Sequence, residues 1–200
     1  MVRNPEQTRA RLLEAATEEF AARGIAGARI DRIAEAGKAN KAMIYAYFGS
    51  KDELFDAAFA VGVSDLLLMV KFDATDLPAY AGRLFDCFED NPRILRLATW
   101  YQLERPQGSS LLSIASANDD KLAGIAKAQS DGVIPDRYSP VELLSLVRSL
   151  ATSWSTYSHS TLAAAATVER DRRRLAVTDA VRRLVEPAQN QPTMKETLND

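Results

Sequence analysis

The chain is poor in the residues on which many enzymes and exported proteins depend. Its 200 residues include one cysteine and one histidine, which excludes an internal disulfide and any cluster of these ligands with metal-binding spacing. No uninterrupted apolar run approaches the roughly 20 residues of a membrane-spanning helix, and the first residues lack the apolar core of a signal peptide. These absences predict a cytoplasmic protein that has no membrane partner.

Catalytic motifs are missing as well. No glycine-rich phosphate loop follows a strand pattern, and no serine stands in a nucleophile-elbow pattern. Carboxylates are numerous but scattered, so we predict no catalytic residue, no metal site and no cofactor. Cys87, between Phe85 and Phe88, is interpreted as a small buried apolar side chain, with a redox sensor as the alternative.

The apolar residues recur with helical spacing, and no strand pattern of any length appears. We therefore predict an all-α fold. Asn4 and Pro5 open the first helix, which we expect Gly24 to end. Later helices are expected before Gly37, at about 40–47, 51–70, 77–89 and 92–105, then one that ends at about 130, one that begins at 140, and one at about 168–185. We divide the chain into residues 1–50, residues 51–187 and a flexible tail at 188–200.

The most informative stretch is 24–54. Ile30, Ile33 and Ala34 give a short helix one apolar face, and Gly37 is expected where that helix stops and the chain turns. Asn40 is suited to cap the next short helix, and Ser50 to Glu53 forms a capping box for a third. Two short helices joined by a tight turn make a helix-turn-helix, which presents one helix to the DNA major groove.

Two runs in this stretch carry a family resemblance. Ile33-Ala34, followed by Tyr-Ala-Tyr-Phe-Gly-Ser-Lys-Asp-Glu-Leu at 45–54, resembles the signature of the TetR family of bacterial transcription regulators. The resemblance covers about the first quarter of the chain. It implies that residues 1–50 form a three-helix helix-turn-helix DNA-binding domain and that residues 51–187 form a helical ligand-binding and dimerisation domain. It also implies repression that is relieved by a small-molecule ligand. Ala28, Arg29, Ala42 and Met43 depart from the usual residues, which leaves the base preference open.

Charge is concentrated in the same stretch. The chain has a net charge of −2, but residues 29–51 hold five lysines and arginines and two acidic residues, a local +3 that suits phosphate. At the start of the second short helix, a lysine suits guanine and an alanine methyl suits the thymine methyl. Hydroxyls and cations nearby suit phosphate, although Tyr45 has packing within the unit as an alternative. The predicted DNA-binding residues are Arg29, Asn40, Lys41, Ala42, Tyr45, Tyr47 and Lys51.

The C-terminal part offers a dimer face and pocket candidates. The helix after Ser139-Pro140 is apolar over much of its girth, which predicts a homodimer built from the last two helices; completion of one monomer's core is the alternative. The TetR resemblance implies a small-molecule pocket. Its candidate residues, each of which has core packing as an alternative, are Phe85, Phe88, Trp100, Tyr101, Trp154 and Tyr157. We interpret His159 as a surface or interface residue and the basic run 170–174 as a solvated helix face.

Together these features predict a ligand-responsive transcriptional regulator. In this hypothesis a dimeric repressor binds a palindromic operator of double-stranded DNA and is released by a small-molecule effector. The alternative is an all-helical protein-interaction module whose helix-turn-helix is only structural. The sequence does not separate a repressor from an activator.

Overall fold

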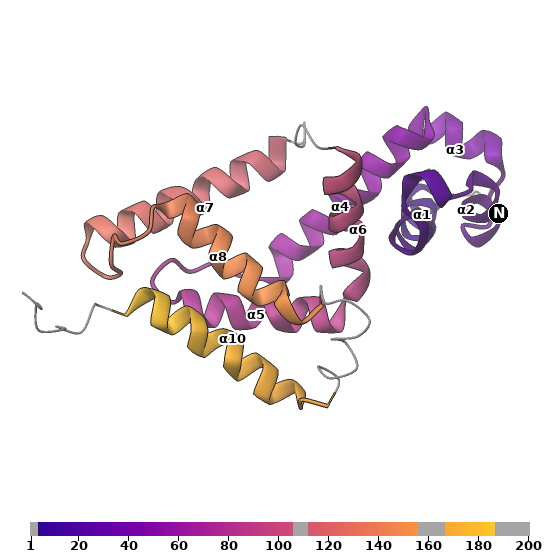
Figure 1. The fold of residues 1–200 in the computed structure, drawn as a ribbon. Coiled ribbons are helices and arrows are strands. Elements are labelled where there is room, and N and C mark those ends of the chain that lie inside the picture. Colours follow the sequence, from indigo (N-terminus) through magenta and orange to yellow (C-terminus); the bar gives the residue numbers. More distant parts are fainter. Residues whose placement is uncertain (1–3, 106–111, 156–166, 187–200) are drawn as a thin grey trace, which may run out of the picture. The chain divides into compact units, whose positions relative to one another are not determined.

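The computed structural model describes residues 4–105, 112–155 and 167–186, and in the described part every regular element is helical (Figure 1). Within these ranges no helix combines the length and apolar character that crossing a bilayer requires. The prediction of an all-α fold is confirmed. The elements are α1 (Pro5–Gly27), α2 (Ile30–Ala36), α3 (Lys41–Phe48), α4 (Lys51–Met69), α5 (Leu77–Asp90), α6 (Pro92–Glu104), α7 (Leu112–Ser130), α8 (Pro140–Thr152), the 3-10 turn η1 (Ser153–Ser155) and α10 (Arg170–Val185).

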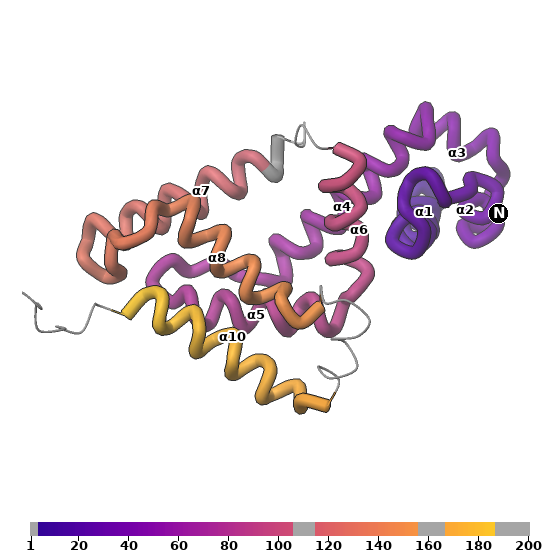
Figure 2. The backbone as a smooth tube through the Cα atoms, viewed as in Figure 1, coloured from indigo at the N-terminus to yellow at the C-terminus, as the bar shows by residue number. Residues whose placement is uncertain are grey.

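The helices group into two compact units. The first comprises Met1–Lys71 and Arg83–Asn118, and the second comprises Phe72–Gly82 and Asp119–Asp200. The division therefore passes through α5 and α7 rather than between helices. Both helices can be followed along the backbone in Figure 2. The domain boundary predicted after residue 50 concerns function rather than compactness, and it stays a prediction.

The first unit is built on α1, α4 and α6, which pack against one another. Phe20 of α1 meets Phe55 of α4 edge to face, with ring centroids 5.0 Å apart. Tyr101 of α6 stacks on Phe59 of α4 at 3.6 Å. Ile33 of α2 and Ile44 of α3 are fully buried in the same core, so the two short helices are held in place by apolar packing.

The end of α1 differs from the expectation. Helical structure runs on to Gly27, and Gly24 marks a kink within it, with φ at +64°. A side chain at this position would be strained in the left-handed region. Its Cβ would also lie 2.8–2.9 Å from the ring of Trp100 on α6. Gly24 therefore lets α6 approach closely rather than ending the helix.

The other helix ends agree with the sequence to within one or two residues, the usual scatter for frayed termini. The oxygen of Asn40 accepts a hydrogen bond from the Met43 amide at 2.9 Å, and Ser50 accepts one from the Glu53 amide at 3.0 Å. α3 therefore begins one residue after its cap, at Lys41. The last helix begins at Arg170 rather than near residue 168.

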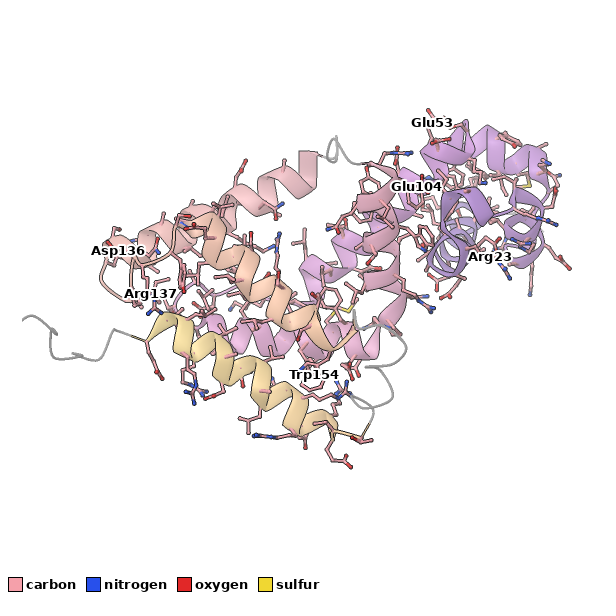
Figure 3. All side chains as sticks on the ribbon, viewed as in Figure 1. Arg23, Glu53, Glu104, Asp136, Arg137 and Trp154 are labelled. Carbon is pink, nitrogen blue, oxygen red and sulfur yellow. The ribbon has the colours of Figure 1, made fainter. Side chains whose placement is uncertain are left out.

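In the second unit α8 and α10 lie side by side (Figure 1). Leu143 and Val147 of α8 are buried, as are Val177 and Val181 of α10. Arg137, labelled in Figure 3, donates to the Leu184 carbonyl at 2.9 Å. A cation at that point satisfies a free carbonyl and faces the negative end of the helix dipole. The helices α8 and α10 thus form a packed pair, in which Ser139 caps the start of α8 and Arg137 binds the last carbonyls of α10.

Candidate DNA-binding surface

The helix α3 has one buried and one open face. Ile44 is fully buried and Phe48 nearly so. Lys41, Ala42 and Tyr45 are exposed, with Tyr45 43% exposed. Positions 44 and 48, one turn apart, share the buried face, and positions 42 and 45 share the exposed one. Lys41 is exposed because it is the first residue of the helix. The outward face carries an ammonium group, a methyl group and a phenol hydroxyl, which are groups that suit base edges and phosphates.

The turn before α3 uses two adjacent residues for different purposes. Gly37, expected to make the turn, has an ordinary φ of −76°. Glycine is favoured there for another reason, since a Cβ would lie 2.7 Å from a methyl carbon of Leu12, which would have to shift. Lys38 takes the left-handed conformation, with φ at +52°, and is the one non-glycine residue of positive φ in the described ranges. Such a conformation costs a lysine roughly 1–2 kcal/mol.

The start of α2 is held by a carboxylate from α1. Glu19 accepts hydrogen bonds from the Arg29 amide at 3.0 Å and from Arg32 Nε at 2.7 Å. Arg32 also donates to the Gly27 carbonyl at 2.9 Å. Burial opposes ionisation of Glu19, but the hydrogen bonds from Arg32 and the Arg29 amide outweigh it and lower the pKa of the carboxyl. This network fixes the angle at which α2 enters the helix-turn-helix.

The positive charge predicted for this stretch is partly used within the protein. Arg32 is engaged by Glu19, and Lys41 Nζ lies 3.4 Å from Asp31 Oδ1 of α2. Arg29 and Lys38 form no ion pair among the described residues, and both are exposed. Lys51 opens α4 and forms none there either. These three cations remain available to phosphate, and the Lys41–Asp31 pair lies between the starts of α2 and α3.

Most of the predicted DNA-binding residues lie on the open side of this unit. The side chains of Arg29, Lys41, Ala42 and Tyr45 are exposed. Asn40 is also exposed, but its oxygen is occupied as the α3 cap. Tyr47 is half-buried against Phe48, and Lys51 is half-buried. Their contacts with DNA stay predictions.

Two residues of this surface are absent from the predicted set. Asp31 pairs with Lys41, and Lys38 sits at the left-handed turn position. Lys38 was foreseeable, because a lysine directly after the turn glycine lies next to the recognition helix. Asp31 was not foreseeable, because a lone acidic residue in a basic stretch is ordinarily interpreted as a solvated surface charge.

The aromatic residues predicted to line a pocket differ in burial and in the unit to which they belong. Phe85, Phe88 and Tyr101 are buried, and Tyr101 is committed to the aromatic stack with Phe59. Trp100 is half-buried against the first unit's core. Trp154, labelled in Figure 3, lies half-buried in η1 of the second unit. Tyr157 and His159 lie outside the described residues. Their role in binding a ligand stays a prediction.

The last two helices also present an outward apolar surface. Val141 and Leu146 of α8 and Leu175 of α10 are exposed. Along α10 runs a groove of about 520 Å³, lined by Arg172, Leu175, Ala176, Asp179, Ala180 and Arg183. Ala176 and Ala180 stand one turn apart, so another helix could approach this face closely. The α8–α10 face is hereafter the exposed surface formed by these residues of both helices.

Two family descriptions match the chain. "Bacterial regulatory proteins, tetR family" matches residues 12–58, which span all of α2 and α3. "Tetracyclin repressor-like, C-terminal domain" matches residues 76–183, more than half of the chain. The two matches follow one another along the sequence as the helix-turn-helix and the later helices do.

Individual proteins give the same picture. The chain is similar to the HTH-type transcriptional repressor SCO4008 of Streptomyces coelicolor, with 40% identity over 157 residues, covering 76% of this chain and 80% of that protein. It is also similar to the solved structure of the transcriptional regulator SCO4942 from Streptomyces coelicolor, at a TM-score of 0.78 and 37% identity, covering 89% and 98% of the two chains. FadR of Bacillus subtilis, solved with stearoyl-CoA, has a TM-score of 0.63 at 12% identity, covering 89% of this chain and 100% of FadR, and shows the fold alone.

Proposed function

Because the chain belongs to the TetR family and is a transcriptional regulator rather than an enzyme, we propose that it represses transcription as a homodimer bound to a palindromic operator. Binding of a small molecule by the C-terminal helices releases it from DNA. Its site of action is then the cytoplasm, where the bacterial chromosome lies.

The observation that carries the proposal is the outward face of α3. Lys41, Ala42 and Tyr45 lie exposed on a helix whose other face is locked into the core. A rigid helix with exposed donors at its start fits the major groove. Arg29, Lys38 and Lys51 provide cations around it, which suits anchoring to the phosphate backbone.

The first experiment is selection of bound fragments from the source genome, followed by affinity measurements over a salt series. We expect a palindromic site bound tightly, with affinity that falls steeply as salt rises. Lys41→Ala should weaken binding to that site by about 1–3 kcal/mol while sparing random DNA. Weak binding without sequence preference would contradict the proposal and favour the protein-interaction module.

A dimer is supported by the α8–α10 face. Symmetric operators pair with two-fold proteins, whose recognition helices lie about one turn of DNA apart. Leu146 and Leu175 are exposed, and Ala176 and Ala180 line the groove on α10. Such a surface suits contact with the same helices of a second copy. Complementary charges accompany them, since Arg172, Asp179 and Arg183 line the same groove.

Leu175→Asp tests the dimer directly. Leu175 is half-exposed on α10, so a carboxylate there should leave the fold intact but place an unpaired charge in the interface. We expect sedimentation to show mainly the 22.0 kDa monomer and operator affinity to fall sharply. Leu103→Asp, at an exposed leucine of α6, is the matched control and should remain dimeric. Equal sedimentation of both variants and the native protein would place the interface elsewhere.

A candidate for the effector site within the second unit is Trp154, a half-buried side chain of η1. Its ring combines a large apolar area with one N–H donor, the mixture typical of small-molecule sites. The fold of FadR holds stearoyl-CoA, which supports a ligand site without indicating its chemistry. Hydrophobic and aromatic compounds should be screened for release of the operator. A Trp154→Ala variant that responds to every active compound with unchanged affinity would remove that residue from the site.

A further inference from the structure

Asp31 places a negative charge where DNA is expected to lie. It stands in the first turn of α2, with its side chain 76% exposed and its Oδ1 3.4 Å from Nζ of Lys41. A carboxylate close to phosphates is repelled by them, so its presence on this surface weakens non-specific binding. An acidic residue at this place is explained either by a structural role or by a hydrogen-bond donor on the DNA.

The structural role of Asp31 in the described part of the molecule is small. An acidic residue in the first turn of α2 interacts favourably with the helix dipole, by about 0.3–1 kcal/mol at an exposed position. The start of α2 is held by Glu19, which accepts from the Arg29 amide, and Arg29, the N-cap residue, makes no capping hydrogen bond through its side chain. Asp31 is too exposed to support the core. Its polar contact there is Lys41 alone, and an ion pair between such exposed groups adds about 0–1 kcal/mol to stability. The carboxylate is therefore free to turn toward a ligand.

DNA offers a carboxylate few donors. In the major groove they are the amino groups of cytosine N4 and adenine N6, and an acidic side chain characteristically accepts from cytosine N4. Guanine presents two acceptors, O6 and N7, which a lysine can bind. An ammonium and a carboxylate held side by side thus complement the guanine and the cytosine of a G·C pair or of neighbouring pairs.

We infer that Asp31 is a specificity-determining residue that accepts a hydrogen bond from an exocyclic amino group beside the base contacted by Lys41. This inference rests on the proposed function, and it adds a base-contacting residue on α2 to the one on α3. Cytosine is the expected base, with adenine as the other source of the same donor. The two side chains act as a donor and an acceptor on either side of the turn.

The test measures the affinity of each variant for the operator, for all single-base changes of one half-site made symmetrically, and for random DNA. Asp31→Ala should lose about tenfold in discrimination per half-site at one base pair, while its affinity for random DNA rises. Asp31→Asn should shift the preference at that pair toward adenine, because asparagine binds adenine N6 and N7. Glu35→Ala removes the same charge from the other end of α2, where the side chain is also exposed, and should leave the base profile unchanged.

A role limited to positioning Lys41 is distinguished by a double-mutant cycle. In the Lys41→Ala background, Asp31→Ala should still remove discrimination at its base pair; no further change there would overturn the inference. Equal tightening of operator and random DNA, without any change in base profile, would also overturn it. Native protein that shows no sequence preference would instead refute the proposed function. Unchanged thermal unfolding of the variants will confirm that they fold.

Discussion

Glu19 is expected to be the polar residue on which the DNA-binding unit depends most. Its side chain is 12% exposed and joins α1 to α2 through two groups, the Arg29 amide at the start of α2 and the guanidinium of Arg32 within α2. Glu19→Gln keeps the shape but removes the charge, and it replaces one oxygen acceptor by an amide NH2 group, a donor that then faces the donors of its partners. We therefore expect both a loss of stability and a loosened α2.

The magnitude follows from these contacts. Hydrogen bonds to a charged group contribute about 1.5–3 kcal/mol, and because Arg32 is 37% exposed, solvent screening places the loss near the lower end, at about 2 kcal/mol. For a chain of this length that corresponds to a fall of about 4–8 °C in melting temperature. Denaturant unfolding and calorimetry at fixed protein concentration measure it, since a dimer's stability depends on concentration.

The pH dependence gives a second, independent test. The contacts of Glu19 lower its pKa in the folded protein, so the folded state favours the ionised form. Its contribution is fully present above the ordinary glutamate pKa of about 4.3 and is lost as the pH falls through the lowered folded value. The stability difference between native protein and Glu19→Gln should be constant near neutrality and shrink in acid.

Glu18→Gln is the matched control. Glu18 lies next along α1, but its side chain is 60% exposed and pairs with Arg93 on the surface, so its loss should cost less than about 1 kcal/mol. Two results would refute the reasoning: a cost for Glu19→Gln no larger than that of the control, or a cost that stays the same from pH 7 into acid.

Two further predictions concern backbone positions of the same unit. Gly24→Ala should destabilise the protein by about 3 kcal/mol, because it adds left-handed strain to a clash with the Trp100 ring. Calorimetry measures the loss of stability, and tryptophan fluorescence reports the displaced ring. A melting temperature within 2 °C of the native value (about 0.5 kcal/mol) would contradict the prediction. Lys38→Gly should stabilise the protein by up to about 1 kcal/mol, because glycine tolerates the positive φ at this position. It should also weaken binding to random DNA and to the operator alike, and reduce by about 0.9 the slope of the logarithm of the binding constant against the logarithm of salt concentration. Unchanged DNA affinity would show that Lys38 makes no phosphate contact.

The positions of the helices could be predicted well because their signals are local. The caps at Asn40 and Ser50 depend on side-chain oxygens within three residues of the amides that they bind. The buried faces of α2 and α3 follow from spacing alone, as at Ile33 and Ile44. The exposed face of α3 then follows from the same spacing for Ala42 and Tyr45, and the exposure of Lys41 follows from its place at the start of the helix, which is why these residues could be named from the sequence.

The sequence by itself thus determined an all-helical chain, a helix-turn-helix near its start, the residues on the outer face of α3 and the family resemblance. Each of these depends on neighbours along the chain. Only the tertiary structure decided what Gly24, Gly37 and Glu19 do, because Trp100, Leu12 and Arg32 approach them from other helices. The packing of three helices also brought Asp31 to Lys41, ten residues apart, because the turn between α2 and α3 folds their starts together.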